Sequence, residues 1–201
     1  MANPSPHDDD HCPVNGYEAA WQLSDFARRM LPRVLAQDHA LAIDHPITAQ
    51  ALIEHFSRVW PDAQTPTPDT LDRVAQALRQ FRNSAVLAIM ARDCSRAADL
   101  HETLTSISAL ADITIHAAYR AAMTAAVAQH GIPRDASGRP QDMMIVGMGK
   151  LGGFELNVSS DVDLIYVFSE EGETDASSPN SRAIDTHTFF TKVGRRIGAL
   201  L

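Results

Sequence analysis

Residues 143–168 read MMIVGMGKLGGFELNVSSDVDLIYVF, and this stretch decides the expected fold. Two apolar runs, at 143–146 and 164–168, flank a segment rich in glycine, hydroxyl and charged residues. Short apolar runs bounded by turn residues are typical of buried strands. Because the second run is apolar on both faces beyond Asp163, we expect it to be an interior strand. The chemistry of the protein is expected in the segment between the two runs.

Two acids, Asp161 and Asp163, stand at the entrance of the second strand. At i, i+2 they lie on one face of an extended chain, with Cα atoms roughly 7 Å apart. Two carboxylates about 5 Å apart repel by roughly 3 kcal/mol at an effective dielectric constant of about 20. A partly buried pair therefore favours a divalent cation or a shared proton, and Mg²⁺ suits one or two carboxylates completed by water and phosphate oxygens. A bare Asp-x-Asp is more often a solvated pair, so the upstream residues decide the interpretation.

The upstream segment has the groups that a phosphate site needs. Its glycines let the backbone turn sharply and bring N–H groups close to an anion. These glycines are Gly147, Gly149, Gly152 and Gly153. Lys150 supplies a point charge suited to phosphate, and Ser159 and Ser160 can donate hydroxyl hydrogen bonds. Together they predict a nucleotide-phosphate cradle.

Three motifs compete for this segment. A Walker A loop needs Ser or Thr after its lysine, but Leu151 follows Lys150, so this motif is excluded. The dinucleotide fingerprint G-x-G-x-x-G is present at 147–152, with Glu170 at a suitable distance for a ribose. However, only residues 153–160 separate the last glycine of this fingerprint from Asp161, whereas a parallel crossover needs roughly a dozen residues or more. The favoured order is strand, glycine turn, short connection and Asp-x-Asp strand, which nucleotidyl transfer needs.

The motif GMGKLGGFELNVSSDVDLI at 147–165 resembles the signature of the glutamine synthetase adenylyltransferase/adenylyl-removing enzymes, within the polymerase-beta-like nucleotidyltransferase superfamily. That family carries two catalytic copies, and ELNVSSD at 155–161 is similar to the amino-terminal, deadenylylating copy. The resemblance extends from about Leu71 to the end of the chain. Other segments that resemble the family are LRQFR at 78–82, ARD at 91–93, LAD at 110–112 and FFTK at 189–192. Because Arg79 and Arg82 lie in one of these segments, they are candidates for contact with phosphate or an acidic partner.

The resemblance implies Mg²⁺-dependent phosphorolysis of the adenylyl-tyrosine bond of glutamine synthetase, releasing ADP. Asp161 and Asp163 would be the catalytic metal ligands. ADP or ATP would be held by Gly149, Lys150, Gly152, Gly153, Ser159 and Ser160. Glutamine synthetase and a PII signalling protein are the implied partners. The superfamily uses a third carboxylate on a later strand, which we expect beyond Leu201, so we expect a truncated chain that is inactive or very weak by itself.

Two other functional classes remain open. A regulatory module could dock glutamine synthetase or PII through its helices while its site is vestigial. A dinucleotide-binding oxidoreductase would bind NAD without Mg²⁺. Within the favoured class, transfer of AMP from ATP to tyrosine would use the same carboxylates, and only the family resemblance favours removal.

Composition limits the remaining possibilities. The 201 residues are 45% hydrophobic, which is enough for a sizeable core, and the net charge of −8 argues against nucleic-acid binding. The two cysteines, Cys12 and Cys94, are far apart and suit a reducing cytosol. The chain lacks a signal-peptide pattern and an apolar run of membrane-spanning length, so we expect a cytoplasmic protein without membrane association.

The expected fold is α+β, with an amino-terminal helical bundle followed by an incomplete nucleotidyltransferase-type mixed sheet with flanking helices. Residues 1–15 are expected to be a disordered lead, 16–135 a helical region, and 136–201 the start of a nucleotidyltransferase (adenylyl-removing) domain that is truncated at its C-terminus. Apolar periodicity predicts helices at about 17–37 with a possible kink at Pro32, 48–60, 68–92, 98–130 and from 184 onward, with a linker at 61–68 and loops at 134–141 and 169–180.

Overall fold

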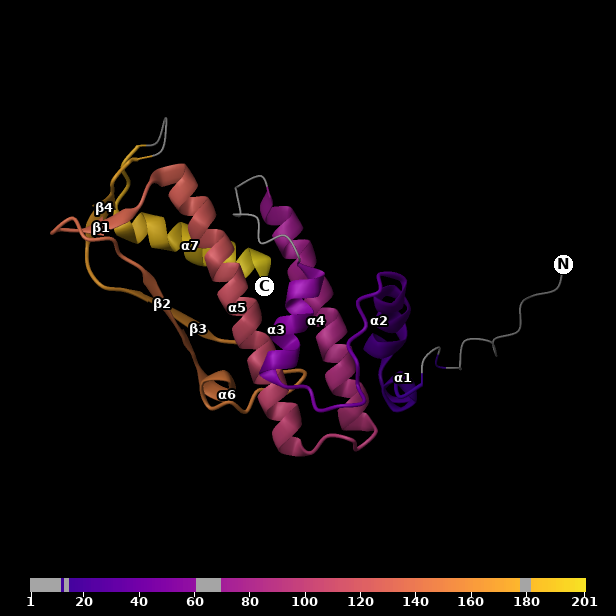
Figure 1. The fold of residues 1–201 in the computed structure, drawn as a ribbon. Helices are drawn as coiled ribbons and strands as arrows, with labels where there is room; N and C mark the ends of the chain where they lie inside the picture. Colours follow the sequence, from indigo (N-terminus) through magenta and orange to yellow (C-terminus); the bar gives the residue numbers. More distant parts are fainter. Residues whose placement is uncertain (1–11, 13–14, 61–69, 178–181) are drawn as a thin grey trace.

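The computed structural model describes residues 12, 15–60, 70–177 and 182–201, and the amino-terminal half of this part is helical (Figure 1). Its helices are α1 (Glu18–Leu23), α2 (Asp25–Ala36), α3 (Ala49–Val59), α4 (Leu71–Cys94) and α5 (Leu100–His130). The predicted lead at 1–15 and the linker at 61–68 fall almost wholly outside the described residues. No helix within the described ranges has the length and apolarity needed to cross a membrane.

The first predicted helix, 17–37, is two helices in the structure. The break is at Ser24, whose backbone is extended and whose Oγ accepts a hydrogen bond from Ala27 N at 3.3 Å. A serine in this position caps the next helix by satisfying a free N–H group. Helix α2 continues through Pro32, so the predicted single helix is divided at Ser24.

The later helices confirm the predicted pattern. Thr48 caps α3 by accepting from Ala51 N at 3.2 Å, and Asp99 caps α5 by accepting from Glu102 N at 2.8 Å. Gly131, with φ of +83°, ends α5, as expected for a glycine that adopts positive φ beyond a helix. Helices α4 and α5 pack against each other and form the centre of the molecule (Figure 1).

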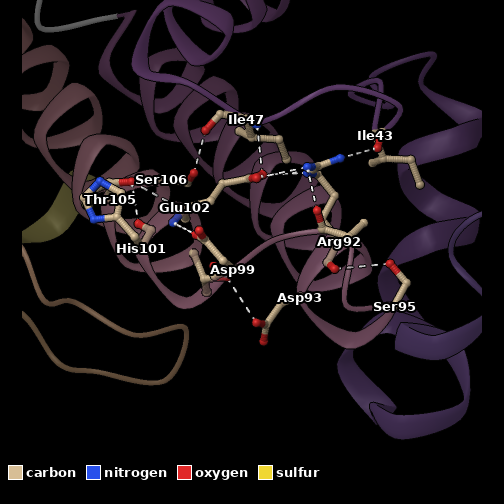
Figure 2. A network of polar contacts seen from close by, with 12 residues as sticks. Ile43, Ile47, Arg92, Asp93, Ser95, Asp99, His101, Glu102, Thr105 and Ser106 are labelled. Carbon is tan, nitrogen blue, oxygen red and sulfur yellow. Dashed lines mark hydrogen bonds and ion pairs between the residues drawn. The ribbon is translucent and has the colours of Figure 1, made fainter.

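A largely buried ion pair joins α4 and α5 near the turn between them (Figure 2). Arg92 Nε and Nη2 donate to the two carboxylate oxygens of Glu102 at 2.6 and 2.9 Å. Arg92 Nη1 also donates to Ile43 O at 2.8 Å, and Glu102 accepts from Ile47 N at 3.2 Å. The pair therefore holds the segment between α2 and α3 against the helical hairpin.

Two antiparallel sheets follow the helices. Strand β1 (Pro133–Asp135) pairs with β4 (Gly172–Thr174), and β2 (Met143–Gly147) pairs with β3 (Leu164–Phe168). The last element is α7 (Thr186–Leu200), and the aromatic rings of Phe168 and Phe190 stack between β3 and α7 at 5.0 Å. The α+β class is confirmed, and the expected mixed sheet is present in the described residues only as antiparallel pairs.

Strand β3 is not the interior strand that its sequence predicted. Among the described residues it pairs with β2 alone, and one face of the β2–β3 pair is open. Met144 lies opposite Val167 and Val146 opposite Ile165, and all four side chains are exposed. The opposite face, which includes Ile145 and Phe168, packs against residues of α5 and α7. The apolar residues of β3 therefore form one partly buried, packed face and one exposed face.

The two predicted loops contain strands that the sequence did not reveal. Strand β1 lies at the start of the loop predicted for 134–141, and β4 lies inside the loop predicted for 169–180. Three-residue strands such as these are too short to show an alternating apolar pattern. The final helix is confirmed, and its predicted inward residues are all buried, namely Phe189, Phe190, Val193, Ile197 and Leu200.

Candidate functional site

The glycine turn and the two acids meet at one end of the β2–β3 pair. Gly147 lies opposite Leu164 in the antiparallel register, and Met148 N donates to Asp163 O at 2.9 Å. The connection between the strands contains only a single helical turn, α6 (Gly149–Gly152). Because the strands are antiparallel, the parallel unit of a dinucleotide fingerprint is excluded here. The favoured order of strand, glycine turn, short connection and second strand is confirmed, with both acids just ahead of the second strand.

Two of the predicted glycines are required by the shape of this turn. Gly149 has a φ of +56°, a conformation that side chains disfavour. At Gly152 a Cβ atom would lie 2.6 Å from the carbonyl oxygen of Gly147. Gly153 differs, because the nearest atom to its added Cβ is an ordinary 3.7 Å away. Gly149 and Gly152 therefore shape the turn, whereas Gly153 is free to carry a side chain.

The predicted lysine and serines are brought together beside this turn. Lys150 Nζ donates to Ser160 Oγ at 3.4 Å, which connects α6 to the start of the acidic segment, residues 160–163. Asn157 Oδ1 accepts from Ser160 Oγ at 2.7 Å and from Ser159 N at 3.2 Å. This is the local hydrogen bonding by which an asparagine stabilises a turn. Asn157 was missed as a site residue, although Asn with serines two and three residues later is a turn pattern that the sequence displays.

Asp161 and Asp163 are both exposed, which corrects the expectation of a partly buried pair. Within the described residues, neither side-chain carboxylate accepts a hydrogen bond or forms a salt bridge. The reason is that β3 begins only at Leu164, so both acids lie on the connection ahead of the ladder. Their oxygens are hard, negatively charged donors of the kind that Mg²⁺ takes together with water and phosphate oxygens. The donor set therefore fits Mg²⁺, although no group of three metal-ligating residues exists in the described ranges.

A buried serine that the prediction missed fixes the connection to the helices. Ser108 lies on α5 with no exposed surface, and its Oγ accepts from Leu156 N at 3.3 Å. The Leu156 side chain is buried in the core formed by residues of α3, α4 and α5. The segment that leads to the acids is thus held in position by the helical region. A lone serine in a helical pattern gives no sequence signal of this role.

A cavity of about 430 Å³ lies between α5 and the glycine turn. Asp112, His116 and Tyr119 line it from α5, and Gly147 and Gly152 line it from the turn. Burial raises the pKa of Asp112, and the Tyr119 hydroxyl donates to the carboxylate of Asp142. These ionisable side chains were not among the predicted site residues.

Comparison with known proteins gives the family. A sequence model of the glutamate-ammonia ligase adenylyltransferase family matches residues 21–201. The chain belongs to this family. The match covers the helices, the glycine turn and both acids, so it agrees with the resemblance that the 147–165 motif showed.

Curated relatives in the family are named bifunctional glutamine synthetase adenylyltransferase/adenylyl-removing enzyme. The chain is 44% identical to the protein of Chromobacterium violaceum over 183 residues, 90% of this chain and 19% of that protein. It is 40% identical to the Bordetella pertussis protein over 189 residues, 92% of this chain and 19% of that protein. It is 39% identical to the Thioalkalivibrio sulfidiphilus protein over 198 residues, 96% of this chain and 19% of that protein. The chain thus spans about a fifth of the length of these relatives.

Proposed function

We propose that this chain carries the phosphate and metal site of a nucleotidyltransferase that removes AMP from adenylyl-tyrosine of glutamine synthetase. The reaction is a phosphorolysis. An oxygen of inorganic phosphate forms a bond to the adenylyl phosphorus, the bond from phosphorus to the tyrosine oxygen breaks, and that oxygen takes a proton. The products are ADP and unmodified tyrosine. Glutamine synthetase and a PII protein are the proposed partners, in a cytoplasmic setting.

One observation carries the proposal. The Met148 N to Asp163 O hydrogen bond brings the glycine turn beside Asp163, so the residues proposed to bind phosphate and those proposed to hold the metal lie at one end of the β2–β3 pair. The names of the relatives support the proposed substrate, since they describe adenylyl transfer to, and removal from, glutamine synthetase.

Each polar residue has a role in the proposed reaction. Lys150 and Ser160 bind and orient the phosphate, together with backbone N–H groups of the glycine turn. Asp161 and Asp163 would hold Mg²⁺, which when bound would neutralise charge on the transferring phosphate. Asn157 acts as a positioning residue because it holds the Ser160 hydroxyl. Positioning and charge neutralisation are the main demands of phosphoryl-type transfer.

Metal titration of the 201-residue chain tests this proposal. Isothermal titration calorimetry with Mg²⁺ in the presence of ADP should show binding that Asp161→Asn and Asp163→Asn each weaken by about tenfold or more, because each removes a charged ligand. Glu171→Gln is the matched control, since Glu171 is an exposed acid beyond the other end of β3. Equal Mg²⁺ affinity in the wild type and both aspartate variants would refute the proposed metal site.

The same variants separate catalysis from a purely regulatory role. A docking module with a vestigial site would retain its effect on glutamine synthetase after Asp161→Asn. The proposed enzyme would lose phosphate-dependent ADP release from adenylylated glutamine synthetase while retaining its binding to that protein. ADP release should be assayed in a family member of full length that carries the equivalent substitution.

A further inference from the structure

A second cavity, of about 340 Å³, adjoins Ser160 and Asp161. It is a groove between helices α4 and α5 and the connection that leads into β3. Its walls are largely apolar and include Val86, Leu110, Ala111, Leu156 and Val158. An apolar groove with a few polar groups at one place is typical of a small-molecule site, and its volume falls in the usual range for one.

The groove is continuous with the proposed phosphate site. Ser160 and Asp161 line the groove, and Ser160 Oγ also accepts from Lys150 Nζ at 3.4 Å. A ligand whose phosphate contacts Lys150 and Ser160 therefore has an apolar surface within reach of the group attached to that phosphate. The Arg82 guanidinium also lines the groove and donates to Leu201 O. Of the two candidate arginines, Arg82 is thus at the site, and Arg79 is exposed elsewhere on α4.

We propose that this groove binds the nucleoside part of the nucleotide, with the base against the apolar walls from α4, α5 and Val158. The inference rests on the proposed function, because it needs the phosphate to lie at Lys150 and Ser160. A purine base is planar, uncharged at neutral pH and largely apolar on its faces, and it matches walls that carry few polar groups. The base is joined to its phosphate through one ribose, which is consistent with a groove that begins at Ser160 and Asp161.

The groove makes Ala111 and Val158 determinants of nucleotide affinity. Ala111 is half-buried on α5 and lines the groove, so a larger side chain there would occupy part of the groove. Val158 is 37% exposed, and Val158→Asn removes apolar contact without adding charge near the phosphates. Ala111→Phe should have the larger effect on nucleotide affinity. Val158→Asn is a second variant at an exposed position, where a substitution should not disturb the fold. Ala128→Phe on the exposed surface of α5 is the matched control.

The test compares two ligands, Mg²⁺-ATP and Mg²⁺-tripolyphosphate, by calorimetry on the 201-residue chain. Ala111→Phe should weaken ATP binding by about tenfold or more, the size of effect that a changed apolar pocket produces. Val158→Asn should weaken it several-fold. Tripolyphosphate, which has no base, should bind all variants as it binds the wild type, and Ala128→Phe should leave both ligands unaffected. Circular dichroism checks that each variant is folded.

Other outcomes separate failure of the groove from failure of the proposed function. If tripolyphosphate binds and ATP affinity is unchanged in Ala111→Phe and Val158→Asn, the groove does not hold the base, while the phosphate site stands. If ATP binds the wild type no more tightly than tripolyphosphate, the groove is likewise excluded. If neither ligand binds the wild type, both the phosphate site and the groove are refuted.

Discussion

Two acidic sites in this chain differ in how the protein uses them. Glu102 is paired with Arg92, and their side chains are only 18% and 7% exposed. Both its oxygens accept hydrogen bonds from the arginine (Figure 2). Asp161 and Asp163 are exposed and have no side-chain partner among the described residues. A carboxylate satisfied inside the fold stabilises it, whereas a carboxylate held at a fixed place without a partner remains available to a ligand.

The largest effect expected from this comparison is on stability. Glu102→Ala leaves the buried Arg92 guanidinium without a carboxylate partner, and removal of one member of a buried pair costs about 3–5 kcal/mol. The free energy of unfolding, measured by urea denaturation, should fall by that amount. Glu54→Ala on the exposed surface of α3 is the control and should change the free energy by at most about 0.5 kcal/mol. Similar losses in the two variants would contradict the structural role of the pair.

The pH dependence of stability sharpens the same prediction. A hydrogen bond from Arg92 is the main reason why the pKa of Glu102 lies below its usual value of 4.5. A lowered folded-state pKa contributes stability that is present above the unfolded pKa and is lost as the pH falls through the folded pKa. Wild-type stability should therefore decline below about pH 4.5 more steeply than that of Glu102→Ala, measured by urea denaturation at a series of pH values.

A second, smaller effect concerns the glycine turn. Gly152→Ala places Cβ 2.6 Å from a backbone oxygen, so the turn must shift. Strain of this kind costs about 1–3 kcal/mol. Gly153→Ala is a matched control one residue away, because its Cβ meets no atom closer than 3.7 Å. The two thermal melting temperatures should differ, with only Gly152→Ala below the wild type, and the reverse order would show that the described turn is wrong.

The sequence was sufficient for the elements that have strong local signals. The 3.6-residue period predicted α3, α4, α5 and α7, and the two apolar runs predicted β2 and β3. Spacing argued against a parallel crossover, and the antiparallel pairing of β2 with β3 excludes it. The placement of Gly152 against the Gly147 carbonyl follows from the same short connection, because the chain has to turn back on itself within a few residues.

The sequence was insufficient wherever burial depends on distant partners. It could not show that Ile165 and Val167 face solvent, because exposure depends on which segments cover the sheet. It could not show that Ser108 holds Leu156 or that Ala111 borders a groove, since these contacts join residues far apart in the chain. The division at residues 135 and 136 into two domains stays a prediction. So do the roles of the site residues.

The smallest effect on stability should come from the acids of the candidate site. Asp161→Asn and Asp163→Asn remove no internal contact of the described residues, so each should change the free energy of unfolding by at most about 0.5 kcal/mol. The same substitutions should reduce Mg²⁺ binding. Glu102→Ala should show the opposite pattern, because it lowers the free energy of unfolding and removes no proposed metal ligand. Urea denaturation without metal measures the first quantity. A loss above about 2 kcal/mol in either aspartate variant would mean that these carboxylates stabilise the fold, and the contrast with Glu102 would then fail.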